Sequence, residues 1–210
     1  MYFSATIFAL VGFNAPTLAS LSIAITNFLF TSVAFFLIDR VGRRRILLLS
    51  IPVMIAGLVL CALAFNFIHL PTPHDAIEGS AETSNGATFW AFIILLSMVV
   101  YVCGYGVGMG PVPWQQSELF PLSVRSLGSG LATATNWGSN FVVGLTFLPM
   151  MEVLTPVWTF AAYAGVCVGG WWCVWRIYPE TMGLGLEEVG GLLADGWGVE
   201  ESRSGVGIRR

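Results

Sequence analysis

Long apolar stretches alternate along this chain with short polar segments. Five of them are long enough to cross a bilayer, which takes about 20 apolar residues in a helix. They cover residues 18–38, 46–68, 88–113, 127–151 and 157–175. A shorter apolar stretch, 1–13, would extend only about 20 Å as a helix, which is too little for a full crossing. The pattern predicts an all-α membrane protein with a helix bundle over residues 1–178, whose first helix is truncated.

Composition supports the membrane interpretation. Of the 210 residues, 56% are hydrophobic and 10% are charged, with a mean hydropathy of +0.78. A soluble domain has roughly a quarter charged residues. The sequence shows no basic stripe of the kind that binds nucleic acid, so the lipid bilayer is the expected environment and no nucleic-acid partner is expected.

The charged residues are sorted between alternate loops. All nine basic residues fall within 39–45, 115–126 and the stretch from 176 onward, whereas the loop 69–87 has acidic residues but no Lys or Arg. The positive-inside rule places the basic loops in the cytoplasm. We therefore expect residues 179–210 to form a cytoplasmic tail. A soluble helical bundle has no reason to sort its charges in this way.

The predicted spans contain no Asp, Glu, Lys, Arg or His. Ionisable residues within a membrane usually mark ion or proton paths. This portion of the protein is therefore expected to hold neither a proton-coupling carboxylate nor a counter-ion for a charged ligand. The lack of acids, bases and metal ligands in the spans also argues against an enzyme, and no cofactor or metal is expected. The cysteines lie in apolar stretches without a CxxC pair and are expected to be buried thiols: Cys61, Cys103, Cys167 and Cys173.

Amides, hydroxyls and indoles are the polar candidates within the spans, and we single out three amides and one indole. Asn136 and Asn140 lie four residues apart, so they share a helix face, and Trp137 adjoins them. An amide can donate and accept hydrogen bonds at once, which suits a ligand with many hydroxyls. Amides in membranes also bond neighbouring helices. Both interpretations stay open for Asn27, and we favour a ligand site for the other three residues.

The segment 104–114 reads GYGVGMGPVPW. Gly and Pro at this density destabilise a regular helix, and transporters place substrate sites at discontinuous helices. Gly104 and Gly108, like Gly106 and Gly110, also have the GxxxG spacing of closely packed membrane helices. Either interpretation can hold, and so can both.

The basic loops also contain acidic residues, which lie close in sequence to the arginines. Asp39 precedes Arg43 by one helical turn, Glu118 and Arg125 flank a short loop, and Glu180 follows the last span. Surface pairs of this kind contribute about 0–1 kcal/mol and can simply fix topology. The functional alternative is an ionic latch that forms in one state of the protein and breaks in another.

Several motifs, in order along the chain, resemble the sugar-porter branch of the major facilitator superfamily. DRVGRR at 39–44 resembles the D/E-R-x-G-R-R loop of that family, and PVPW at 111–114 with ELF at 118–120 resembles its tenth helix. NWGSNF at 136–141 resembles its eleventh helix, and PETMG at 179–183 resembles its closing P-E-T-K-G, with Met182 in place of Lys. Segments 1–4, 113–121 and 132–137 are similar to fungal myo-inositol/proton symporters.

The resemblance implies the carboxy-terminal six-helix half of a major facilitator fold. It further implies transport of a sugar or cyclic polyol, most closely myo-inositol with proton symport, by alternating access in the plasma membrane, with the coupling group in the missing half. Hexose carriers often have Glu at the position of Gly106, so the hydroxyl pattern recognised can differ from that of glucose. A carrier-like nutrient sensor and an inactive truncated fragment are the alternatives.

The resemblance also assigns roles to individual positions. It implies substrate contact or gating for Tyr2, Asn27, Trp114, Asn136 and Trp137. It implies a cytoplasmic ionic network made of Asp39, Arg43, Arg44, Glu118, Arg125 and Glu180.

Overall fold

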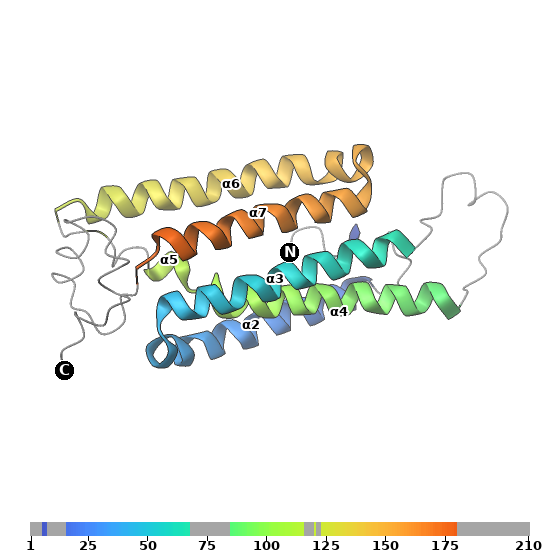
Figure 1. Cartoon of the computed structure of the whole chain (residues 1–210), viewed down its shortest axis with the longest axis horizontal. Coiled ribbons are helices and arrows are strands. Elements are labelled where there is room, and N and C mark those ends of the chain that lie inside the picture. Colours follow the sequence, from blue (N-terminus) through green and yellow to red (C-terminus); the bar gives the residue numbers. More distant parts are fainter. Residues whose placement is uncertain (1–5, 8–15, 68–84, 116–119, 121–122, 180–210) are drawn as a thin grey trace.

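The computed structural model describes residues 6–7, 16–67, 85–115, 120 and 123–179, and every regular element in this part of the chain is a helix. The elements are α2 (Pro16–Val41), α3 (Arg43–Phe67), α4 (Asn85–Gly108), the short α5 (Val112–Gln115), α6 (Arg125–Val153) and α7 (Thr155–Ile177). The five long helices run roughly along one axis (Figure 1).

Four of these helices are long and apolar enough to cross a membrane: Thr17–Ile38 within α2, the whole of α3, Phe89–Gly108 within α4, and α7. The predicted all-α membrane class is thereby confirmed. Helix α6 covers the predicted stretch 127–151 and has 29 residues, but it is not among the four. The difference has a chemical reason, because the middle of α6 holds Thr133, Thr135, Asn136, Ser139 and Asn140. Helix α6 is therefore a long helix with a polar side.

Two predicted segments fall largely outside the described residues. The partial helix 1–13 is described only at residues 6–7, where Ile7 is buried. The predicted tail is described only at residue 179. All four cysteines are free thiols, and Cys61 is buried, but Cys173 is exposed on α7. The expectation of buried thiols is therefore wrong for Cys173, because an apolar stretch does not reveal which side of its helix faces the bundle.

A single glycine separates α2 from α3. Gly42 has a φ of 97°, in the left-handed region that residues with a Cβ rarely adopt. Its N–H donates to the Ile38 carbonyl at 3.2 Å, and its own carbonyl accepts from the N–H of Ile46 at 3.2 Å. The glycine of the basic loop thus ends one helix and starts the next.

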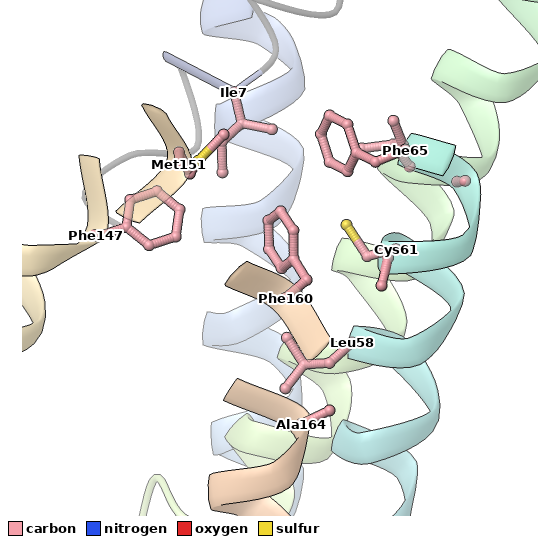
Figure 2. Packing of buried hydrophobic residues seen from close by; sticks show 11 residues of the cluster. Ile7, Leu58, Cys61, Phe65, Phe147, Met151, Phe160 and Ala164 are labelled. Carbon is pink, nitrogen blue, oxygen red and sulfur yellow. The ribbon is translucent and has the colours of Figure 1, made fainter. Parts of the chain in front are cut away.

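Helix α3 is the centre of the bundle, since it packs on both α4 and α7, while α2 packs on α4 and α6 packs on α7. The core lies mainly between α3 and α7, as Figure 2 shows. Phe65 stacks on Phe160 with ring centroids 5.4 Å apart, and Phe147 of α6 meets Phe160 edge-on at 6.2 Å. These aromatic contacts join three helices around Phe160.

Helix α4 approaches α3 through one pair of glycines. A Cβ added to Gly104 would lie 2.9 Å from Met54 Cγ and 3.0 Å from the Ser50 carbonyl oxygen. A Cβ on Gly108 would collide with the Ser50 side chain. This first GxxxG pair therefore serves close packing of α4 on α3.

The second pair of glycines faces a different helix. A Cβ on Gly106 would lie 3.1 Å from Phe30 Cβ, and a Cβ on Gly110 would lie 3.3 Å from Thr31 Oγ1. Both neighbours belong to α2. The close-packing interpretation of the glycines is confirmed for both pairs, and the two pairs hold α4 between α2 and α3.

The same segment also interrupts the helix. Helix α4 ends at Gly108, and the N–H groups of Met109 and Gly110 both donate to the Tyr105 carbonyl at 2.9 Å. Pro111 follows in a turn before α5 begins. The predicted discontinuity is therefore present at residues 109–111, while a substrate site at this break stays a prediction.

Charge is sorted between the two ends of the bundle. The turn between α2 and α3, the start of α6 and the end of α7 lie at one end, toward the left in Figure 1. The end of α3, the start of α4 and the turn between α6 and α7 lie at the other, together with Glu152. All arginines in the described part of the chain are at the first end: Arg40, Arg43, Arg44, Arg45, Arg125 and Arg176.

Candidate functional site

Asn27 lies on the side of α2 that faces α4. One turn before it, Ile23 clusters with Val102 of α4, and one turn after it, Thr31 lies against Gly106 of α4. The Asn27 Oδ1 atom is buried and has no hydrogen-bond partner among the described residues. Leaving a buried acceptor unpaired costs about 1–3 kcal/mol. A ligand hydroxyl that donates to this oxygen would remove the cost.

Helix α6 presents Asn136, Trp137 and Asn140 together on its exposed surface, and Trp137 is 62% exposed. The side-chain amide of Asn140 donates to the Asn136 carbonyl at 3.0 Å, within the same helix. A Cβ added to Gly138 would meet nothing within 4 Å. In the described part of the chain, these amides therefore do not join neighbouring helices, and their polar face stands open.

The structure brings only part of the predicted site together. Asn136, Trp137 and Asn140 share one helix, whereas Asn27 belongs to α2, which packs chiefly on α4. Trp114 lies in α5, but its side chain is outside the description, and Tyr2 lies outside the described residues altogether.

The predicted ionic network is described only on its cationic side. The Glu118 and Glu180 residues and the side chain of Asp39 lie outside the description. Arg43 is partly buried at the first turn of α3. The Arg125 Nε donates to the Phe120 carbonyl at 3.3 Å. An ionic latch at this end stays a prediction.

Arg44 makes a contact that the sequence did not reveal. It is 7% exposed, and its Nη2 donates to the Trp175 carbonyl at 2.9 Å, in the last turn of α7. The unpaired carbonyls at the end of a helix and its dipole both favour a cation there. A second bond follows one turn on, where Trp171 Nε1 donates to the Leu48 carbonyl at 3.2 Å. These bonds fasten α7 to the start of α3.

The arrangement suits binding rather than bond chemistry. Within the described residues, no three His, Cys, Asp or Glu side chains gather closely enough to hold a metal ion. The available groups are amide oxygens and nitrogens, hydroxyls and an exposed indole. Such groups bind a neutral ligand with several hydroxyls through paired hydrogen bonds, and the indole face can pack on its C–H groups.

Comparison with known proteins places these residues in context. Residues 1–193 match a family model described as "Sugar (and other) transporter". The chain is 45% identical over 203 residues to myo-inositol transporter 1 of Cryptococcus neoformans var. grubii, an alignment that covers 97% of this chain and 35% of that protein. It is 45% identical over 207 residues to myo-inositol transporter 2 of Schizosaccharomyces pombe, covering 98% of this chain and 35% of the relative. The predicted similarity to fungal myo-inositol transporters is confirmed, and this chain spans about a third of the length of these curated relatives.

Solved structures show the same fold. A structure of the major facilitator proton:xylose symporter XylE bound to 6-bromo-6-deoxy-D-glucose has a TM-score of 0.74 at 24% identity, covering 91% of this chain and 38% of that one. The inward-open xylose transporter XylE from E. coli has a TM-score of 0.65 at 26% identity, covering 90% of this chain and 40% of that one. The helices are therefore arranged as in part of a major facilitator bundle, as the sequence predicts.

Proposed function

This chain belongs to the sugar (and other) transporter family, and from that premise we propose that it is part of a carrier for a sugar or cyclic polyol, with myo-inositol as the substrate. One observation carries the choice of substrate. The myo-inositol transporters of C. neoformans and S. pombe share 45% of their aligned residues with nearly the whole chain. The neutral, amide-bearing spans are consistent with an uncharged, hydroxyl-rich substrate.

The open face of α6 would form one wall of the substrate path. Asn136 and Asn140 would bond the substrate hydroxyls, while Trp137 packs on its ring. Asn27 would add an acceptor, because its Oδ1 has no partner among the described residues. An amide face of this kind is costly against lipid, so it belongs beside a water-filled path or beside the remainder of the carrier. Tyr2 and Trp114 complete the proposed set of substrate contacts.

Transport would proceed by alternating access, with this portion rocking against the rest of the carrier. Proton coupling would depend on a group in the rest of the carrier, because the predicted spans of this chain contain no Asp, Glu, Lys, Arg or His. The arginine-rich end would face the cytoplasm of a plasma-membrane protein, with the tail on that side. There, Arg43, Arg44 and Arg125 would pair with Asp39, Glu118 and Glu180 in one state of the cycle.

The test is uptake of labelled myo-inositol by yeast that lacks its own inositol carriers. The chain is expressed alone and together with the amino-terminal half of the related S. pombe carrier. We expect uptake in the combined cells, suppressed by excess unlabelled myo-inositol but not by xylose. Inositol binding without uptake in either arrangement would contradict transport and favour a nutrient sensor.

A paired variant tests the assigned site in the same cells. Asn136→Ala should lower uptake at limiting substrate by about tenfold, the effect of losing one hydrogen bond of about 1.4 kcal/mol. Thr135→Ala is the matched control, because its hydroxyl donates to the Leu131 carbonyl of its own helix. Equal uptake by the two variants would exclude Asn136 from the substrate site.

A further inference from the structure

The contact between α3 and α7 at the arginine-rich end fixes which side chains flank it. Arg44 and Leu48 of α3 bond Trp175 and Trp171 of α7, respectively. These four residues therefore mark the line along which the two helices touch. The helices are antiparallel, since α3 starts at this end and α7 finishes there (Figure 1).

The residues that follow the contact residues all point to one side. Each step along a helix turns by about 100°, and in an antiparallel pair this turn carries the next residue of both helices to the same side. Arg45 follows Arg44, Trp172 follows Trp171, and Arg176 follows Trp175. Their exposure agrees with this geometry, because Arg45 and Arg176 are exposed and Trp172 is 54% exposed.

Two exposed guanidinium groups thus flank the outer side of the contact between α3 and α7. The Arg176 guanidinium carbon lies 5.6 Å from the centre of the Trp172 ring. Among the side chains that the structure describes, the only carboxylate is that of Glu152, at the opposite end of the bundle, because the side chain of Asp39 lies outside the description. This patch, Arg45, Trp172 and Arg176, thus carries two exposed guanidinium groups and lies where the apolar helices end.

An apolar face with two open glycines continues from this patch along α7. Gly165 and Gly169 lie eleven and seven residues before Arg176, a spacing that puts all three on one helix face with Trp172. A Cβ on either glycine would meet nothing within 4 Å. Unlike the glycines of α4, they accommodate no neighbouring helix in the described part of the chain. This face is apolar, whereas the open face of α6 carries amides, so the face of α7 suits hydrocarbon and the face of α6 does not.

We propose that this surface binds an anionic phospholipid from the leaflet at the arginine-rich end. The Arg45 and Arg176 guanidinium groups hold the phosphate between them, because guanidinium matches phosphate through paired, charge-assisted hydrogen bonds. Trp172 lies at the level of the headgroup, where indoles are enriched in membrane proteins. One acyl chain lies over Gly165 and Gly169. The inference is independent of the transported substrate.

Native mass spectrometry tests the headgroup contacts. The purified chain is released from detergent in the presence of equal phosphatidylserine and phosphatidylcholine. We expect retained phosphatidylserine to exceed phosphatidylcholine, and we expect Arg45→Gln and Arg176→Gln each to weaken its retention about fivefold, the effect of one arginine near an anionic surface. Arg40→Gln is the matched control, because Arg40 is an exposed arginine at the same end but on α2. An equal loss in all three variants would mean general charge attraction and would overturn the site.

A second pair of variants tests the acyl-chain contact at the open glycines without changing charge. Gly169→Leu should reduce retention of phosphatidylserine, because the leucine occupies the space above Gly169 that the acyl chain would fill. Gly170→Leu should not, because Gly170 is equally open but points about 100° away around α7. Circular dichroism identifies any variant that does not fold. If a glycine variant does not fold, the arginine variants test the lipid site, and the reverse holds if an arginine variant does not fold.

The native mass spectra also test whether a second copy of the chain, rather than a lipid, covers this face of α7. Two copies of the chain could pack through Gly165 and Gly169, since small residues four apart favour helix pairing in membranes. A dimer that Gly169→Leu abolishes, with no preference for phosphatidylserine in the wild type, would overturn the lipid proposal.

Discussion

The side-chain oxygen of Asn27 is buried and has no hydrogen-bond partner among the described residues. An amide that only joined helices would bond a neighbouring helix, so this property favours the proposed substrate contact over a packing role. Replacing the amide with an apolar group of similar size removes the unpaired acceptor, which is close to neutral or stabilising for the fold. We therefore expect Asn27→Leu to leave the melting temperature unchanged or higher and to weaken myo-inositol binding about tenfold. Thermal melting and calorimetric titration of the purified carrier measure the two quantities. A lower melting temperature with unchanged binding would make Asn27 a structural residue.

Arg44 acts through the backbone of a distant helix. Its guanidinium is buried and donates to the Trp175 carbonyl, so its removal leaves the end of α7 without that donor. A hydrogen bond from a charged group contributes about 1.5–3 kcal/mol. Arg44→Ala should lower the free energy of unfolding by that amount, measured by denaturant titration in detergent. Arg40→Ala, at an exposed position of the same end, should change it by less than about 0.5 kcal/mol, and equal effects would contradict the role given to Arg44.

At the scale of the elements, replacing a glycine with alanine should have opposite effects on stability in α3 and in α7. A Cβ on Gly57 of α3 would lie 2.9 Å from the Tyr101 nitrogen and 3.0 Å from the Ser97 carbonyl oxygen of α4. Backbone atoms cannot move aside, so Gly57→Ala should destabilise the bundle by about 1–3 kcal/mol. Gly165→Ala, in open space on α7, should instead stabilise it by up to about 1 kcal/mol through helix propensity. Unfolding experiments on the two variants should show opposite signs, and a loss at Gly165 would mean that its face is already occupied.

The sequence predicted elements better than contacts between them. Apolar stretches locate helices because each helix satisfies its own backbone, so their positions depend on local composition. The GxxxG spacing likewise predicted close packing but not that the two pairs on α4 face different helices. Arg44 and Trp175 lie 131 residues apart, and no local pattern links them. The exposure of Cys173 was missed for the same reason, since it depends on which side of α7 meets α3.

The candidate site was predicted through its chemistry and only partly through its geometry. The spacing of Asn136 and Asn140 correctly gave a shared face on α6. That this face stands open in the described chain follows from the packing of α6 on α7, which the sequence does not encode locally. The unpaired oxygen of Asn27 depends likewise on the close approach of α2 and α4.

For the molecule as a whole, the sorting of arginines predicts its orientation in the membrane. The sequence has no Asn-x-Ser/Thr acceptor for N-glycosylation, so acceptors can be introduced singly. Glu78→Asn completes one with Ser80, within the segment that joins α3 to α4, and should be glycosylated because the positive-inside rule predicts that this segment faces away from the cytoplasm. Glu200→Asn completes one with Ser202 in the tail and should stay unmodified. A glycosidase-sensitive mobility shift on gels reads the result, and the reverse pattern would invert the orientation.

The contact between α3 and α7 also constrains how the protein is made. A ribosome releases α2, α3 and α4 before α6 and α7, so the glycine-packed group of three helices can assemble while synthesis continues. Phe65 cannot stack on Phe160, and Arg44 cannot donate to the Trp175 carbonyl, until α7 has been synthesised. Throughout that interval, the side of α3 that becomes the core faces lipid or the insertion machinery. Closure of the α3–α7 contact is therefore a late event in the assembly of these helices, completed only when α7 has entered the membrane.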